Sequence, residues 1–228
     1  MKQTPKSASA GLFDRHGAPQ HYPPGITLLR QGAAVREVYA LQHGLVKLAH
    51  PAANGRECVL GLRTAGDWLG AAAAVLQVPA PCSALTLTGC ELYRLPVAAY
   101  LDRLKTDPDF AWERHAALSR ELTNQMQHAA DLVCASGRQR LEQVLWQMAR
   151  ELAAPASGPP GKAAGKLAGK HLKVRLQLPL QQQELAALIA VTPAHLSRLF
   201  NKLEQAGLLR RDDGWVVLPA PDRLWRAR

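Results

Sequence analysis

Residues 179–218 constrain the fold more than any other stretch, because they hold two short amphipathic helical patterns separated by a turn. In the first pattern, Leu185, Leu188 and Ile189 recur at the i, i+3 and i+4 spacing of one helix face. The second pattern begins after Thr192, whose side chain can cap free backbone N–H groups, and the proline that follows suits the first helical position. The stretch therefore predicts a helix-turn-helix.

The second helix has two faces of different chemistry. One face repeats at i, i+3, i+4 and i+7 and is expected to lie in a core: Leu196, Leu199, Phe200 and Leu203. The other is small or polar and is expected to face solvent: Ala194, Ser197, Arg198, Asn201, Lys202 and Gln205. Arginine donates two hydrogen bonds to guanine, serine and asparagine reach other base edges, and lysine contacts phosphate. The pattern is typical of a DNA-recognition helix, although an ordinary corner between two packed helices has the same periodicity.

The residues after this helix predict a β-hairpin. Gly207 is a helix terminator, and Leu208 and Leu209 read as a short strand. A charged turn over 210–214 then leads to a returning strand over 215–218. A helix-turn-helix followed by such a hairpin is a winged helix.

These motifs together resemble the Crp/Fnr superfamily of bacterial transcription regulators. The resemblance lies in the Gln-Glu-Leu-Ala of 183–186, the cap at Thr192, the Ser197-Arg198 pair and the exit over 203–209. It implies a homodimer that binds an inverted repeat in double-stranded DNA, works with RNA polymerase and has no catalytic role. Ala194 stands where many members read a base with glutamate, and Pro193 replaces an Arg or Val, so the preferred base sequence stays open.

The DNA-contacting residues are predicted from their positions in this motif. We expect Arg198 to bind guanine with two hydrogen bonds and Ser197 to reach a neighbouring base. We expect phosphate contacts from Gln183, Thr192, His195 and Lys202, and Asn201 completes the predicted DNA-binding set. The charge distribution agrees: residues 138–228 hold 15 Lys and Arg against 7 Asp and Glu, whereas residues 1–137 hold 13 against 11. A basic C-terminal part suits a polyanionic partner better than an evenly charged surface would.

Short apolar runs separated by glycines fill residues 21–96, after a polar segment over 1–18 that we expect to be a flexible tail. The runs lie at 27–29, 38–41, 45–48, 58–62, 84–88 and 91–95. Strands at such even spacing predict a small antiparallel β-roll, with Asn54 and Gly55 as its best hairpin turn. This part also resembles Crp/Fnr sensor domains, through 24–32, 44–48 and 66–70.

Two charged residues that the resemblance implies for a cyclic-nucleotide site are missing. Family members that bind the nucleotide hold its ribose with a glutamate and its phosphate with an arginine, whereas this chain has alanines over 71–74 and Pro-Cys-Ser-Ala over 81–84. Binding a cyclic phosphate in a buried site without a guanidinium to pair it would cost on the order of several kcal/mol, the usual penalty for an unpaired buried charge. Cyclic AMP is therefore not expected, unless Arg63 or Arg120 serves as a different phosphate anchor. We expect the alanine run to fill a core; the alternative is that it lines an apolar pocket.

No other effector is indicated by the residues. The four cysteines form no CxxC pair, and none lies before Cys58, where an N-terminal iron–sulfur cluster of the family would need them. Haem ligation by a histidine or cysteine is disfavoured, because isolated histidines are seldom ligands. Redox sensing through the thiols of Cys82 and Cys90 has no more support from the sequence than haem ligation has. The haem-ligand candidates are His21, His43, His50 and Cys82. The effector stays unknown.

A long helix is predicted from Asp107 to about Ala135, with an apolar stripe along one side. The stripe comprises Phe110, Leu118, Leu122, Met126, Ala129, Leu132 and Val133. Packing against the β-roll is one explanation, but the length of the stripe favours a partner helix. In Crp/Fnr proteins the equivalent helix forms the dimer axis, which would place two recognition helices about 34 Å apart, one turn of DNA.

The complete prediction is an α+β protein with an N-terminal antiparallel β-roll, a long dimerisation helix and a C-terminal winged helix-turn-helix. Its segments are a tail over 1–18, the roll over 19–106, the helix over 107–136 and the DNA-binding domain over 137–228. Within the DNA-binding domain we expect a hinge at Gly137, a helix over 138–152, a lysine-rich loop over 155–173 and a strand over 173–178. No membrane span, secretion signal or catalytic motif is apparent, so we expect a cytoplasmic protein that is not an enzyme. The alternative class is a roll-based ligand-binding or scaffold protein without affinity for DNA.

Overall fold

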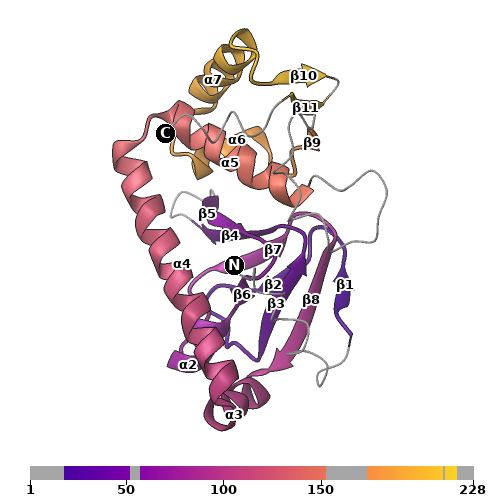
Figure 1. The fold of residues 1–228 in the computed structure, drawn as a ribbon, viewed down its shortest axis with the longest axis vertical. Coiled ribbons are helices and arrows are strands. Elements are labelled where there is room, and N and C mark those ends of the chain that lie inside the picture. Colours follow the sequence, from indigo (N-terminus) through magenta and orange to yellow (C-terminus); the bar gives the residue numbers. More distant parts are fainter. Residues whose placement is uncertain (1–17, 52–56, 153–173, 213, 220–228) are drawn as a thin grey trace, which may run out of the picture. The chain divides into compact units, whose positions relative to one another are not determined.

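A computed structural model describes residues 18–51, 57–152, 174–212 and 214–219. The chain divides into two compact units, one of Met1–His50 and Leu62–Leu122 and the other of Pro51–Gly61 and Thr123–Arg228. The predicted tail, the Asn54-Gly55 turn and the lysine-rich loop lie outside the described residues. The first unit is a β-roll with helices, and the second is mainly helical (Figure 1).

Two four-stranded sheets form the β-roll. The strands run β1 (Gln20–Tyr22), β2 (Thr27–Leu29), β3 (Glu37–His43), β4 (Val46–Pro51), β5 (Glu57–Arg63), β6 (Trp68–Leu69), β7 (Ser83–Thr86) and β8 (Cys90–Pro96). One sheet has the order β1-β8-β3-β6 and the other β2-β7-β4-β5, and the registers of the β-roll pairs between the described residues are antiparallel. The antiparallel roll is confirmed; β1 and β6, of three and two residues, were not predicted.

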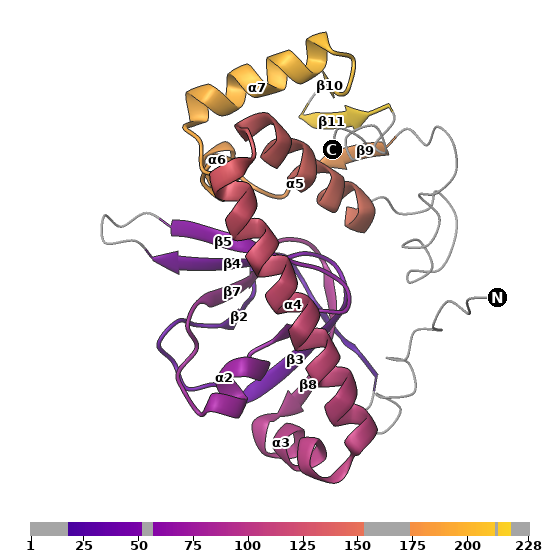
Figure 2. The ribbon, with the colours of Figure 1, turned by 60° about the vertical axis from the view of Figure 1, so that its left-hand side comes forward.

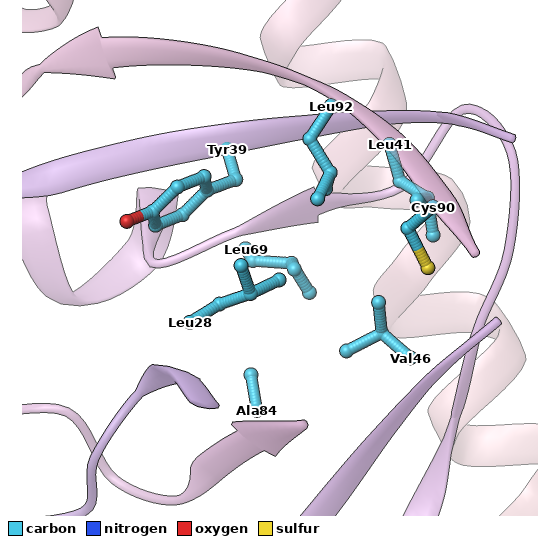
Figure 3. Packing of buried hydrophobic residues seen from close by; sticks show 8 residues of the cluster. All are labelled: Leu28, Tyr39, Leu41, Val46, Leu69, Ala84, Cys90 and Leu92. Carbon is cyan, nitrogen blue, oxygen red and sulfur yellow. The ribbon is translucent and has the colours of Figure 1, made fainter. Parts of the chain in front are cut away.

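Strand β3 is buried on both faces and so joins two cores. Tyr39 and Leu41 point into the roll, whereas Val38 and Ala40 point to the helical side. Alternation of successive side chains explains why four consecutive residues of this strand are buried. The inner core comprises Leu28, Tyr39, Leu41, Val46, Leu69, Ala84, Cys90 and Leu92, which come from both sheets and converge in Figure 3.

Three helices accompany the roll: α2 (Ala71–Leu76), α3 (Val97–Thr106) and α4 (Pro108–Cys134). Ala73 and Ala74 of the alanine run are buried, Ala74 packs in the outer core, and the two larger residues that follow are exposed. The run therefore fills space rather than lining an apolar pocket. Phe110 packs against Tyr100 and Trp68 at centroid distances of 5.8 and 5.9 Å. The spacing placed Phe110 on an apolar stripe for which a partner helix was favoured; for this residue the alternative, packing beside the roll, is the one observed.

Gly44, in the turn between β3 and β4, has both a positive φ of 98° and no room for a side chain. A Cβ there would lie 2.5 Å from the carbonyl oxygen of Gly89. Gly25 is a matched control, because its φ is 86° but nothing lies within 4 Å of a built Cβ. Both Gly→Ala changes carry the left-handed strain of about 1–2 kcal/mol. We expect Gly44→Ala to lower the free energy of unfolding by roughly 1–3 kcal/mol more than Gly25→Ala, the usual cost of overpacking.

Urea unfolding followed by fluorescence measures both glycine variants. Equal midpoints for Gly44→Ala and Gly25→Ala would contradict the close approach at Gly44.

The second unit contains α5 (Gly137–Leu152), β9 (Val174–Gln177), α6 (Gln182–Leu188), α7 (Pro193–Gln205), β10 (Arg210–Asp212) and β11 (Trp215–Leu218). Its sheet has the order β10-β11-β9. The large apolar residues that recur at three- and four-residue spacing along α5 are buried: Leu141, Val144, Leu145 and Met148. The winged helix-turn-helix and the helix over 138–152 are confirmed, and the strand predicted over 173–178 is present as β9.

The first strand of the hairpin begins two residues later than predicted. Leu208 donates its backbone N–H to the carbonyl of Leu203, and Gly207, with φ of 66°, donates to that of Glu204. These bonds close the C-terminus of α7, so the backbone before Arg210 serves the helix cap and not the sheet. The prediction of a strand at Leu208-Leu209 was therefore wrong.

Helix α4 is a continuous helix of 27 residues, and much of its predicted apolar stripe faces solvent. The exposed members are Leu118, Leu122, Met126, Ala129, Leu132 and Val133, of which Leu122 is 61%, Met126 67% and Val133 85% exposed. In the parts of the chain that the structure describes, no helix has the length and hydropathy of a membrane span.

Candidate nucleic-acid interface

Caps at both helix starts set the geometry of the helix-turn-helix. The Thr192 hydroxyl accepts a hydrogen bond of 3.2 Å from the backbone N–H of His195, and Pro193 opens α7, as predicted. At the start of α6, the Glu184 carboxylate accepts from the backbone N–H of Gln181 at 2.7 Å. Between the helices Ala190 has a φ of 50°, which turns the chain sharply enough to bring α7 across α6.

Helix α7 separates its two faces as the periodicity predicts. Leu196, Leu199, Phe200 and Leu203 are buried, while Ala194, His195, Arg198, Asn201, Lys202 and Gln205 are exposed. Among the described residues, Arg198 has no hydrogen-bond or ion-pair partner, and the same holds for Lys202. Figure 2 shows α7 along one side of the second unit, with β10 beside its C-terminal end. A guanidinium and an ammonium group one turn apart are thus available to a ligand.

Ser197 is half-buried at the edge of this face and is already hydrogen bonded. Its hydroxyl donates to the carbonyl of Pro193 at 3.2 Å and accepts from Gln182 Nε2 at 2.7 Å. The hydroxyl therefore has only a lone pair left to offer a base, and its predicted readout role stays a prediction. Gln182, not singled out from the sequence, lies on α6 but reaches α7. No spacing within one helix could have indicated this pair.

The residues predicted to contact phosphates, apart from Lys202, lie at or near the N-terminus of a helix. Thr192 and His195 are exposed at the start of α7, and the Thr192 O–H remains able to donate to a phosphate oxygen. Gln183 lies in the first turn of α6 and is exposed. These positions agree with phosphate contacts, which stay predictions.

Arg211 of β10 was missed by the sequence analysis and holds the hairpin to α7. Its backbone N–H donates to Glu204 at 2.8 Å, its Nε–H donates to the same carboxylate at 2.9 Å, and its Nη2 donates to Asn201 Oδ1 at 2.6 Å. The guanidinium also lies 5.8 Å from the ring centroid of Phe200. Hydrogen bonds from Arg211 lower the pKa of Glu204, so the carboxylate stays charged at neutral pH. The sequence placed Arg211 in a turn, where no partner could be assigned.

A cationic side chain covers the aromatic residue of the hairpin. Arg175 of β9 lies 5.0 Å from the ring centroid of Trp215, and Arg210 pairs with Asp212 at 2.9 Å. These four residues lie on the three-stranded sheet of β9, β10 and β11, which is bonded to α7 through β10. The sheet therefore adds positive charge next to the recognition face.

Arg140 of α5 connects the end of α4 to the helix-turn-helix. Its guanidinium donates to five backbone carbonyls, those of Asp131, Leu132 and Ala135 at 3.4, 3.2 and 2.6 Å and those of Ile189 and Ala190 at 2.8 and 3.5 Å. Carbonyls at a helix C-terminus lack partners within the helix, so a cation there is stabilising. The turn before α7 and the last turn of α4 are consequently bonded to one side chain.

Gly137 allows the same region to pack closely. A Cβ at this position would lie 3.1 Å from Val191 Cγ1 and 3.4 Å from Leu199 Cδ1. The start of α5 therefore contacts the turn and α7 directly. The hinge role of Gly137 stays a prediction.

Comparison with known proteins identifies both parts of the chain. Residues 19–107 match the cyclic nucleotide-binding domain family, and residues 139–227 match the Crp-like helix-turn-helix domain family.

The chain belongs to the Crp/Fnr superfamily of transcription regulators.

Full-length relatives of this Crp/Fnr protein are distant. A CRP-like cAMP-activated global transcriptional regulator of Mycobacterium tuberculosis is 22% identical over 208 residues, covering 91% of this chain and 87% of the relative. Among solved structures, the c-di-GMP responsive global regulator CLP of Xanthomonas campestris is 23% identical, with a TM-score of 0.68 over 93% of this chain and 99% of that one. FixK2 of Bradyrhizobium japonicum is 17% identical, with a TM-score of 0.69 over 91% and 94%. These likenesses show that the fold is shared.

The region where cyclic-nucleotide-binding Crp/Fnr members carry their arginine is occupied differently here. Cys82 is half-buried, and burial raises the pKa of its thiol although the Arg63 guanidinium acts in the opposite direction. Arg63 forms a 2.7 Å ion pair with Glu121 of α4, and its own side chain is only 12% exposed. The guanidinium nearest this region is therefore neutralised by a carboxylate of the same unit. No group of three His, Cys, Asp or Glu in the described part of the chain is arranged to hold a metal ion.

Proposed function

We propose that this regulator binds DNA as a homodimer and reads an inverted repeat through the exposed face of α7. Arg198 carries the proposal, because its side chain is exposed at the centre of that face and is unpaired among the described residues, whereas Ser197 and Asn201 beside it are already hydrogen bonded. An unpaired guanidinium on a helix that protrudes into solvent is suited to the O6 and N7 acceptors of guanine. Thr192, His195, Gln183 and Lys202 would then contact the phosphates on either side.

The exposed stripe of α4 supports the dimer. Large apolar residues that are more than half exposed and recur at three- and four-residue spacing favour a helix–helix seam with a second copy. Two-fold symmetry would present two copies of α7 to successive turns of one duplex. A dimer bound to DNA in this way would work with RNA polymerase in the cytoplasm.

The effector is proposed to be something other than cyclic AMP, although one relative is named as cAMP-activated. The chain has no carboxylate in 70–74 and no arginine in 81–84 to replace the two missing contacts. The alternative is a cyclic-nucleotide-responsive activator that uses Arg63 or Arg120 as its phosphate anchor. Arg63 could serve only if the nucleotide displaced Glu121 from its ion pair, whereas Arg120 is exposed. Isothermal titration with cyclic AMP, cyclic GMP and cyclic di-GMP should give no binding heat. Saturable heat that disappears in Arg63→Ala or in Arg120→Ala would establish the alternative.

Salt dependence tests the DNA-binding proposal. The logarithm of the affinity for duplex DNA should fall linearly with the logarithm of salt concentration, by about 0.9 for each phosphate neutralised. Lys202→Ala should reduce that slope by about 1 for each copy of α7. Arg30→Ala, which removes one charge from an exposed site on the roll, should leave the slope unchanged.

A flat salt plot, or a monomer without affinity for any duplex, would favour the rival class of a ligand-binding or scaffold protein. Fluorescence anisotropy with a labelled duplex measures the slope, and sedimentation gives the oligomeric state.

A further inference from the structure

Only two residues link the long helix to the first helix of the DNA-binding part. Helix α4 ends at Cys134 and α5 begins at Gly137, so Ala135 and Ser136 connect them. Each residue of such a link keeps two soft backbone dihedrals. The angle between α4 and the helix-turn-helix is therefore set by contacts that other groups make across the link.

Arg140 of α5 makes such contacts in two directions. Its Nη1 donates to the carbonyl of Ala135 at 2.6 Å and, over longer distances of 3.2 and 3.4 Å, to those of Leu132 and Asp131 at the end of α4. Its Nε donates at 2.8 Å to the carbonyl of Ile189, where α6 ends and the turn to α7 begins. One guanidinium thus joins the end of α4 to the turn that precedes the recognition helix.

The end of α4 that Arg140 holds also carries part of the exposed apolar stripe. Residues 123–134 of α4 belong to the same compact unit as the helix-turn-helix. In this part of the stripe Met126 is 67%, Leu132 39% and Val133 85% exposed. Leu132 contributes its side chain to the stripe and its carbonyl to Arg140. With the stripe as the dimer seam, a single side chain connects the seam to the turn before α7.

We propose that Arg140 is a positioning residue that fixes the two recognition helices of the dimer relative to its seam and so determines which half-site spacing the protein accepts. The inference rests on the proposed function, because it requires a dimer that reads an inverted repeat. Each base pair inserted between half-sites separates them by about 3.4 Å more and rotates one against the other by roughly 35°. Helices held firmly to the seam tolerate such a change poorly, whereas helices that pivot tolerate it.

The helix-turn-helix has a core of its own, which does not include Arg140. Its buried members include Leu145 of α5, Leu185 of α6 and Leu196 of α7. Helix α5 also approaches the turn directly, since a Cβ at Gly137 would lie 3.1 Å from Val191 Cγ1. A variant of Arg140 is therefore expected to keep a folded reader and to lose its fixed attachment to α4.

Fluorescence anisotropy with the full chain tests this on duplexes whose half-site spacing changes by one base pair at a time. The wild type should bind roughly tenfold or more weakly one base pair away from its best spacing, because the second helix then misses its half-site. Arg140→Met should lose about tenfold or more at the best spacing and vary less than about threefold across spacings, because a pivoting helix has a lower effective concentration at the second half-site. Its affinity for a duplex with one half-site should stay within about twofold of the wild type, because each reader is intact.

Arg150→Met is the matched control, because it makes the same side-chain change on the same helix. Arg150 is exposed and lies over the Trp146 ring of its own helix, 4.8 Å from the centroid. This control should keep the wild-type dependence on spacing. Arg140→Gln is a second test variant, since its shorter side chain has one NH2 group and cannot reach both sets of carbonyls. It should broaden the accepted spacings as Arg140→Met does.

Broadened spacing with half-site binding retained in either Arg140 variant, and absent from the Arg150 control, would support the inference. Wild-type dependence on spacing in both Arg140 variants would overturn it. Loss of half-site binding in both would also overturn it, because Arg140 would then belong to the fold of the reader. A wild type that binds one half-site as tightly as any repeat would instead contradict the proposed dimeric reading itself.

Discussion

Replacing Arg198 with alanine should weaken binding to the selected DNA site by about 1–3 kcal/mol for each half-site and relax the choice of base at one position of the half-site. The side chain makes no hydrogen bond or ion pair with other described residues, so its removal leaves no partner unsatisfied within the protein. The loss should therefore fall on DNA binding and not on stability. Arg198→Lys should keep part of the affinity but lose the base preference, because one ammonium does not reproduce the bidentate contact.

Arg30→Ala is the control for charge alone. It removes the same charge from an exposed position on the roll and should change the affinity by much less. Anisotropy measured on the selected site and on its three single-base variants at that position gives both affinity and preference. An unchanged preference in Arg198→Ala would remove this residue from base readout, even if the affinity fell.

Replacing Leu122 and Met126 together with glutamate should convert the protein to a monomer and lower its affinity for an inverted repeat by at least about a hundredfold. Both side chains are more than 60% exposed, so the single chain loses little core packing. In a dimer, two copies of each would face one another, and four carboxylates would be buried without partners. The affinity falls because one recognition helix no longer raises the effective concentration of the other.

Asn124→Glu is the matched control, since it adds a carboxylate to an exposed position on another side of the same helix. It should leave a dimer with normal affinity. Sedimentation velocity measures the mass of each variant, and circular dichroism checks that α4 remains helical. A Leu122→Glu/Met126→Glu protein that still sediments as a dimer would place the interface elsewhere.

Local periodicity and cap chemistry were sufficient to predict most elements of the second unit. The start of α7 at Pro193 followed from the Thr-Pro pair, and its buried and exposed faces followed from the spacing of its leucines. The strand wrongly predicted at Leu208 and Leu209 shows a limit of local patterns. Two apolar residues after Gly207 resemble a strand, but the backbone N–H of Leu208 closes the helix instead. Phe110 shows the same limit, since spacing placed it on one apolar stripe with residues that are exposed, whereas Tyr100 and Trp68 bury it.

The sequence by itself indicated the family, through motifs that resemble those of Crp/Fnr regulators. It also determined most of the elements and which face of α7 meets solvent, because these depend on residue spacing within single helices and strands. Only the tertiary structure decided which polar groups on that face are available. Gln182 engages Ser197 from another helix, and Arg211 engages Asn201 from a strand ten residues away. Such pairs depend on how separate elements pack, and a hydrogen bond between them leaves no periodic signal in the chain.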